Sequence, residues 1–196
     1  PTKLYGVRPR ALLTGHCESL HSYILSLADL HSWSADRLMR QILPELAEQQ
    51  GIHFDSGWGW DKGSRTDMVG AAEHARRFVA LLTELTGRAE VRWSTLVPLG
   101  KHVCGQGLIA SAERVCLDCL KGDIDAGGKP YGRLLWRLDA VSCCPIHRRR
   151  LVVARCGKFL VKPREDQFMS RRLAGTCSQC DSVGFGCISE TPEEAT

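Results

Sequence analysis

The sequence predicts a mainly helical N-terminal domain that resembles a helix-turn-helix, followed by small α+β modules built around cysteines. Two observations support this prediction. Apolar residues recur every three or four positions in two segments of the first 90 residues, and nine of the ten cysteines lie after residue 100. A chain of 196 residues with 43% apolar residues can form one compact domain or two small ones. We expect a helical domain over 1–100, a cysteine-rich region over 101–188 and a disordered acidic tail over 189–196.

The first expected helix follows Cys17, because Leu20, Ile24 and Leu27 recur at helical spacing. Ser19 is a suitable residue to cap its start.

A second helix is expected after Ser34, which can act as its cap, and Pro44 should end or kink it. Two short helices joined by a tight turn have the outline of a helix-turn-helix. A third helix should begin near Arg65 or Asp67 and stop at Gly87. The apolar run at 91–100 is ambiguous between a strand and a buried turn.

Two short cysteine motifs predict a first metal site. Cys116 and Cys119 form a C-x2-C pair, and Cys144 and His147 form C-P-x-H. Zinc prefers four such ligands in a tetrahedron, so two knuckles separated by a packed apolar element predict a zinc-ribbon or zinc-finger site. Cys143 is adjacent to Cys144, and the C-P-x-H context favours Cys144 as the ligand.

A second all-cysteine zinc site is predicted from another C-x2-C pair and its flanking cysteines: Cys156, Cys177, Cys180 and Cys187. The Cys187 ligand is the least constrained of the four, since Cys143 could replace it. Two zinc ions are therefore expected. A disulfide framework and a redox-active Cys116/Cys119 pair are the weaker alternatives.

Basic residues concentrate after the first site although the net charge is only +4. The set predicted to contact nucleic acid is Arg148, Arg149, Arg150, Lys158, Lys162, Arg164, Arg171 and Arg172. No apolar run is long enough to span a membrane, and no secretory signal is recognisable, so we expect a cytoplasmic protein.

Two stretches of the chain carry a resemblance to a known family. The segment GHCESLHSYILSLADLHSWS resembles the N-terminal signature of the TniQ transposition proteins. The segment from RVCLDCLKGD to CCPIHRRRLVVARC is similar to the zinc region of that family. This chain has Cys156-Gly-Lys where the family often places a second cysteine soon afterwards, and this departure affects the ligand set of the second site.

The resemblance implies an adaptor in transposition without catalytic activity. Such an adaptor links a target-recognition module, in some members an RNA-guided CRISPR effector, to an AAA+ ATPase regulator and hence to the transposase. It also implies a bacterial, cytoplasmic protein that joins the nucleoid when assembled and contacts DNA, guide RNA or both.

Two other functions remain open on sequence grounds. One is an autonomous, sequence-specific DNA-binding protein that acts through the helix-turn-helix and the zinc fingers, with Arg37, Arg40 and Gln41 on the recognition helix. The other is a zinc enzyme, which is disfavoured because sites rich in thiolates are normally closed. Asp118, Asp123 and Asp125 are interpreted as solvated loop residues.

Overall fold

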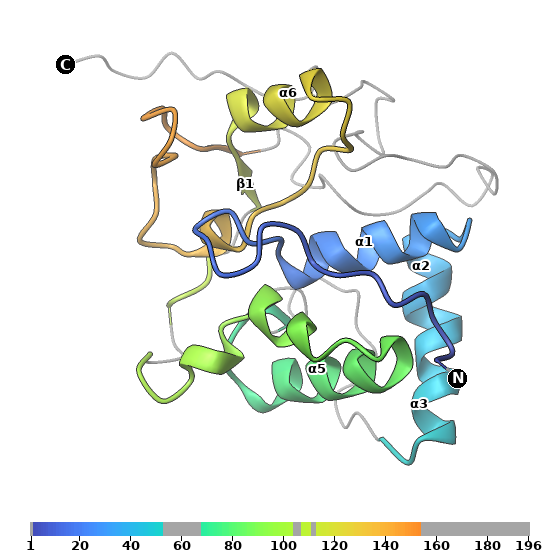
Figure 1. Cartoon of the computed structure of the whole chain (residues 1–196). Coiled ribbons are helices and arrows are strands. Elements are labelled where there is room, and N and C mark those ends of the chain that lie inside the picture. The colour runs from blue at the N-terminus through green and yellow to red at the C-terminus, as the bar shows by residue number, and fades with distance from the viewer. Residues whose placement is uncertain (1, 53–67, 104–106, 111–112, 154–196) are drawn as a thin grey trace.

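The computed structural model describes residues 2–52, 68–103, 107–110 and 113–153, and within them the chain is mainly helical. The main helices are α1 (Leu20–Leu30), α3 (Leu43–Gln49), α5 (Glu73–Thr86) and α6 (Leu117–Asp125). Figure 1 shows α1 between α5 on one side and the later half of the chain, including α6, on the other. In the described part of the chain, no helix is both long and apolar enough to cross a membrane.

Helix α1 begins where the sequence predicts. Ser19 caps it, since its side-chain oxygen accepts a hydrogen bond from the Ser22 N–H at 3.3 Å. Leu20, Ile24 and Leu27 are almost completely buried on the face toward the core. The predicted cap and the predicted apolar face are both confirmed.

The second helix is longer than Pro44 led us to expect. Ser34 caps α2 (Ala35–Arg37), which continues through a π-helical turn (Leu38–Ile42) into α3. A proline cannot donate the usual hydrogen bond, and its ring crowds the carbonyl four residues earlier. The wider π turn immediately before Pro44 gives the ring room. The two helices are joined by a turn at 31–34, and their assignment as a helix-turn-helix stays a prediction.

The third predicted helix is interrupted. Residues 68–69 are helical, residues 70–72 form a bend, and α5 starts only at Glu73. Gly70 explains the break, because glycine is a poor helix former. The predicted stop is confirmed, since Gly87 ends α5 in the left-handed conformation at φ 67°. The ambiguous run at 91–100 forms two 3-10 helices, Ala89–Ser94 and Val97–Leu99.

Two separate clusters of buried residues hold the described chain together. The larger lies among α1, the second helix and α5. The smaller contains Val115, Leu120, Trp136 and Leu151 with three cysteines, and Trp136 comes from a short 3-10 helix (Leu134–Arg137). The division of the chain into domains over 1–100 and 101–188 remains a prediction.

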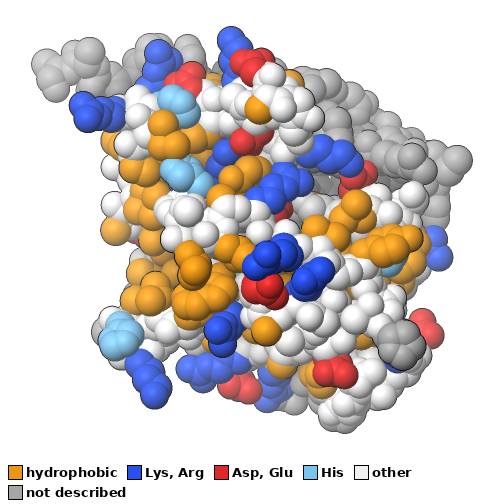
Figure 2. Space-filling view, in the orientation of Figure 1, with side chains coloured by type: hydrophobic (Ala, Val, Ile, Leu, Met, Phe, Trp, Pro, Cys, Tyr) orange, Lys and Arg blue, Asp and Glu red, His pale blue; other side chains and the backbone are white. Residues whose placement is uncertain are grey.

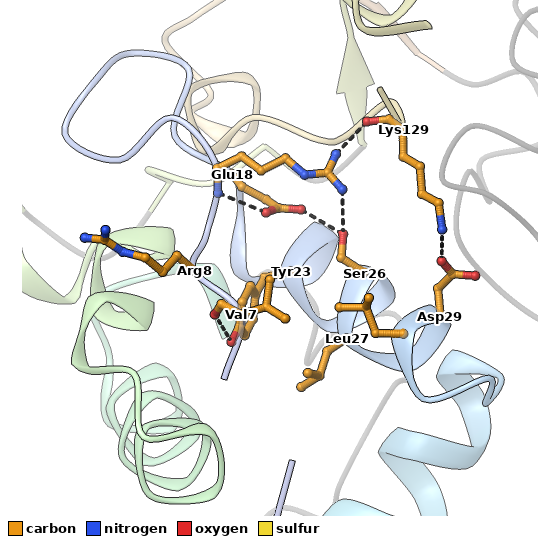
Figure 3. A pocket seen from close by; sticks show the side chains of 10 residues that line it. Val7, Arg8, Glu18, Tyr23, Ser26, Leu27, Asp29 and Lys129 are labelled. Carbon is orange, nitrogen blue, oxygen red and sulfur yellow. Dashed lines mark hydrogen bonds and ion pairs between the residues drawn. The ribbon is translucent and has the colours of Figure 1, made fainter. Parts of the chain in front are cut away.

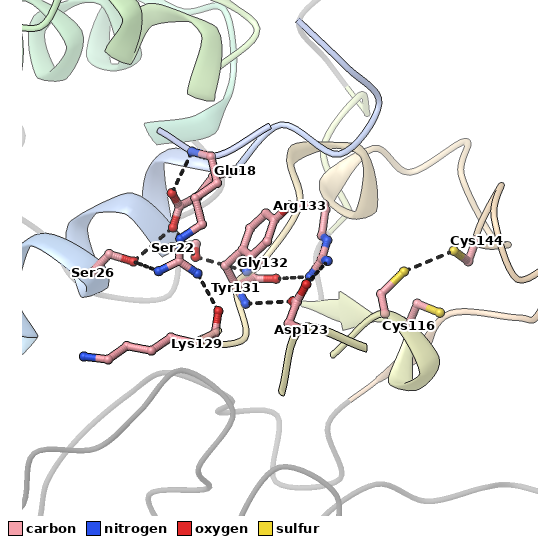
Figure 4. Close-up of polar contacts among 12 residues, drawn as sticks. Glu18, Ser22, Ser26, Cys116, Asp123, Lys129, Tyr131, Gly132, Arg133 and Cys144 are labelled. Carbon is pink, nitrogen blue, oxygen red and sulfur yellow. Dashed lines mark hydrogen bonds and ion pairs between the residues drawn. The ribbon is translucent and has the colours of Figure 1, made fainter. Parts of the chain in front are cut away.

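Polar contacts join the two halves at the start of α1 (Figure 4). The Ser19 N–H donates to the Gly132 carbonyl at 2.9 Å, and the Leu134 N–H donates to the Cys17 carbonyl at 2.8 Å. The Gly132 N–H donates to the Ser22 hydroxyl at 3.0 Å. The loop after α6 is therefore fastened directly to the first turn of α1.

Candidate metal centre

A short antiparallel strand pair brings the two cysteine motifs together. Strand β1 (Arg114–Val115) pairs with β2 (Val152–Val153), with Arg114 opposite Val153 and Val115 opposite Val152. Strand β1 leads directly into Cys116, which precedes α6, and β2 follows the turn that carries Cys144 and His147. Among the described residues this pair is the whole of the β-sheet, so the predicted α+β character of the module is slight.

The second knuckle is closed by its own backbone. The Cys144 N–H donates to the Arg149 carbonyl at 2.8 Å, and the Arg148 N–H donates to the Cys144 carbonyl at 2.9 Å. Arg148 adopts the left-handed conformation, with φ 52°, which lets the chain reverse inside this turn. The loop that holds Cys144 and His147 is therefore a tight hairpin.

The four predicted ligands of the first site lie in one group. The ligand atoms of Cys116, Cys119, Cys144 and His147 are all within 4.8 Å of one another. His147 Nδ1 lies 3.4 Å from the Cys116 Sγ, 3.3 Å from the Cys119 Sγ and 3.7 Å from the Cys144 Sγ. The Sγ atoms of Cys119 and Cys144 are 3.6 Å apart.

These four separations, 3.3–3.7 Å, are close to the edges of a zinc tetrahedron. With Zn–S bonds of about 2.3 Å and Zn–N bonds of about 2.0–2.1 Å, tetrahedral geometry places ligand atoms about 3.5–3.8 Å apart. The group could therefore hold a zinc ion. Four protein ligands leave no open coordination position, which is the arrangement of a structural rather than a catalytic zinc site.

The three thiols of the group differ in the direction of their pKa shifts. Burial raises the pKa of Cys116 and of Cys119, and at Cys119 the contact with Cys144 and the charge of Cys116 act in the same direction. Burial opposes ionisation of Cys144 too, but hydrogen bonds from His147 and Ile146 outweigh it and lower the pKa to about 7. A divalent cation among these sulfurs would offset the cost of their negative charge.

The structure separates the two adjacent cysteines. Cys144 is buried in the group, whereas Cys143 is exposed and lies outside it. Consecutive side chains of an extended segment point to opposite sides, which explains why only one of them reaches the site. The preference for Cys144 agrees with this geometry.

A family model described as TniQ matches residues 9–151 of the chain. The match includes the N-terminal helices and all four residues of the Cys3His group. The chain belongs to the TniQ family. A comparison with curated proteins gave no match.

TniQ membership implies a role in the selection of transposition targets. The match confirms the resemblance predicted from the two sequence motifs. Proteins of this family are transposition adaptors and are not known enzymes. The fold and the Cys3His group are consistent with that role.

Several predicted site residues of this TniQ protein lie outside the described residues. These are the four proposed ligands of the second site, Cys156, Cys177, Cys180 and Cys187, and the basic residues Lys158, Lys162, Arg164, Arg171 and Arg172. The second zinc site therefore stays a prediction. Arg148, Arg149 and Arg150 are described and exposed, and Arg149 pairs with Asp118 at 3.3 Å.

The prediction that Asp123 is a solvated loop residue is wrong. Asp123 belongs to α6, and both of its carboxylate oxygens accept hydrogen bonds from the Arg133 guanidinium, at 2.6 and 2.7 Å. The Arg133 side chain is only 5% exposed and also lies 3.9 Å from the ring centroid of Tyr131. Asp118 and Asp125 are likewise helical. The sequence contained no local signal for this pair, because its partner comes from the loop after the helix.

One cation of the expected recognition helix forms an ion pair within the helix. Arg40 donates to Asp36 at 2.6 Å, one helical turn away. Arg37 is exposed, and Gln41 is the other polar candidate on this helix. The side chains available for reading bases are therefore few.

Proposed function

We propose that this TniQ protein is a target-selection adaptor that links a target-recognition module to an AAA+ ATPase regulator and, through it, to the transposase. The observation that carries the proposal is the TniQ match over 9–151, which takes in both the helical half and the Cys3His group. The recognition module could be an RNA-guided effector. In this proposal the region around the Cys3His group (residues 113–153, the zinc module) supplies rigidity, and the chain itself performs no reaction.

We further propose that Arg148, Arg149 and Arg150 contact DNA or guide RNA. These arginines follow the ligand His147 directly, and backbone hydrogen bonds close the hairpin that carries them. A fixed backbone lowers the ordering cost of binding, and arginine is well suited to phosphate contacts. The other five basic residues of the predicted set lie outside the described residues, and their contact with nucleic acid stays a prediction.

Changing Arg148, Arg149 and Arg150 together to Ala is expected to weaken nucleic-acid binding and flatten its salt dependence. Each lost phosphate contact should reduce the magnitude of the slope of log K against log salt by about 0.9 on duplex DNA. The magnitude of the slope should therefore fall by about 2–3 in the triple variant. Fluorescence anisotropy of a labelled duplex and of a labelled RNA, over a series of salt concentrations, measures this slope.

The matched control removes the same charge elsewhere, by changing the exposed cations Lys3, Arg76 and Lys101 to Ala. It should leave the slope nearly unchanged. Equal slopes for both triple variants would exclude the three arginines from the interface.

The adaptor role is tested by capture of an AAA+ ATPase regulator of transposition. The native protein should retain the ATPase and any copurifying RNA on an affinity column. Cys116→Ser should lose both, because the zinc module would no longer be ordered. Failure of the native chain to bind the ATPase, together with a footprint at one DNA sequence by the purified chain alone, would replace the adaptor with an autonomous DNA-binding protein.

A further inference from the structure

A small hollow lies between the N-terminal segment, α1 and the loop that follows α6 (Figure 3). Its volume is about 210 Å³. Sites for cofactors and drug-sized ligands usually measure about 300–1,000 Å³, so this hollow is the size for a side chain of a partner rather than for a free cofactor.

The inner end of the hollow has no polar group left to recruit a ligand. The buried carboxylate of Glu18 accepts hydrogen bonds from the hydroxyls of Ser22 and Ser26, both at 3.0 Å, and from the Arg10 N–H at 3.2 Å. The Tyr23 hydroxyl donates to the Val7 carbonyl at 2.9 Å. These satisfied groups leave an apolar lining that includes Val7, Leu27 and Leu30.

Leu30 leaves an exposed apolar side chain at the hollow. It lines the hollow and is 47% exposed, although it lies on α1, whose other leucines are mostly buried. The next residue, His31, stacks on Tyr5 with ring centroids 4.4 Å apart, and Tyr5 is 59% exposed. Leu30 therefore offers an apolar contact that a partner could cover at the edge of the hollow.

The exposed charges at this hollow are mainly cations, although Arg8 pairs with Glu90 and Lys129 pairs with Asp29. Arg8, Arg10 and Lys129 line the hollow, against the carboxylates of Glu18 and Asp29. Glu18 is buried and fully engaged, and Asp29 pairs with Lys129. Arg8 is 65% exposed beyond its contact with Glu90. Figure 2 shows basic side chains next to hydrophobic ones on this face.

We propose that the hollow is a docking site for a segment of a partner protein that inserts one apolar side chain and places carboxylates against Arg8 and Lys129. The side chains of Arg8 and Lys129 are 65% and 54% exposed, against 31% and 21% for their carboxylate partners, so the exposed charge favours an acidic, apolar peptide segment over a basic one. The proposal deepens the adaptor role proposed above, since it assigns one face of α1 to a protein partner.

The loop after α6 supplies one lining residue of this docking site, Lys129. Lys129 and Gly132 belong to the loop after α6, and the Arg10 guanidinium donates to the Lys129 carbonyl (Figure 4). The ion pair between Asp123 and Arg133 fastens this loop to α6, and α6 starts at the ligands Cys116 and Cys119. Docking should therefore require bound zinc.

The experiment measures binding of the zinc-loaded full chain to arrays of peptides of about twelve residues, each with a central Leu or Phe in an acidic, neutral or basic context. We expect selective retention on the acidic set. Leu30→Asp should weaken this binding about 30-fold, as loss of a central anchor does. Leu99→Asp is the matched control, because Leu99 is equally exposed at 47% and does not line the hollow.

Two charge-reversal variants distinguish an effect of the charge at the hollow from an effect of the net charge of the chain. Lys129→Glu should weaken binding to acidic peptides about fivefold and improve binding to basic ones. Lys121→Glu carries the same change at an exposed position of α6 outside the hollow and should have no such effect. Removal of zinc by a chelator should abolish selective retention.

Absence of selective peptide binding would overturn the proposal, and so would equal losses for Leu30→Asp and Leu99→Asp. If Lys129→Glu weakened binding of a labelled DNA duplex and left peptide binding unchanged, this face would be assigned to nucleic acid instead. If Leu30→Asp still captures the ATPase regulator, the adaptor role stands and only the docking site fails. If the native chain selects acidic peptides but captures no ATPase, the docking site stands and the adaptor role fails.

Discussion

Cys144→Ser is expected to remove one zinc ion per chain, whereas Cys143→Ser should leave the zinc content unchanged. Structural zinc ions bind zinc-finger peptides with about 10–16 kcal/mol of apparent free energy, so losing one of four ligands should destabilise the module by several kcal/mol. A substitution at the exposed Cys143 should change stability by less than about 0.5 kcal/mol. The two variants differ in a single residue position, which makes them a matched pair.

Native mass spectrometry of the two variants and the parent chain counts the ions, and urea unfolding compares their stability. The difference from the parent chain is the informative quantity, because it is independent of any zinc held by Cys156, Cys177, Cys180 and Cys187. A full zinc content in Cys144→Ser, with loss in Cys143→Ser, would contradict the ligand set. Metal-free protein with paired sulfurs in the parent chain would contradict the site altogether.

Local patterns in the sequence were sufficient for the features that depend on a few adjacent residues. Ser19 and Ser34 predicted the helix starts because a cap acts within one turn, and Gly87 predicted a helix end because glycine tolerates a positive φ. The Cys3His group was predictable for the same reason. Each knuckle is a local turn, and zinc chemistry restricts which residues can complete it.

Features that depend on distant partners were not predictable. The π turn before Pro44 arises because burial of Leu38, Met39 and Leu43 keeps the helix running where its local propensity fails. The break at 70–72 is a similar competition between local propensity and packing. The ion pair of Asp123 was not predictable from the sequence, because its partner Arg133 comes close only when the loop after α6 folds back. The hollow beside α1 likewise needs three segments that are far apart in the chain.

Asp123→Asn is expected to destabilise the chain by about 3–5 kcal/mol, the usual cost of leaving one partner of a buried ion pair without its opposite charge. The substitution preserves the shape of the side chain, so the loss comes from charge and hydrogen bonding rather than from packing. Arg133 is 5% exposed and cannot recover its hydration without moving the loop that carries it.

Asp118→Asn is the matched control, because it removes the same charge from the same helix. Asp118 pairs with Arg149, whose side chain is 76% exposed, and exposed pairs contribute about 0–1 kcal/mol. Urea unfolding of the zinc-loaded chains should shift the midpoint strongly for Asp123→Asn and slightly for Asp118→Asn, with similar slopes. Equal shifts would mean that Arg133 finds another partner. The contact between α6 and the loop would then not be the link through which the zinc module holds the start of α1.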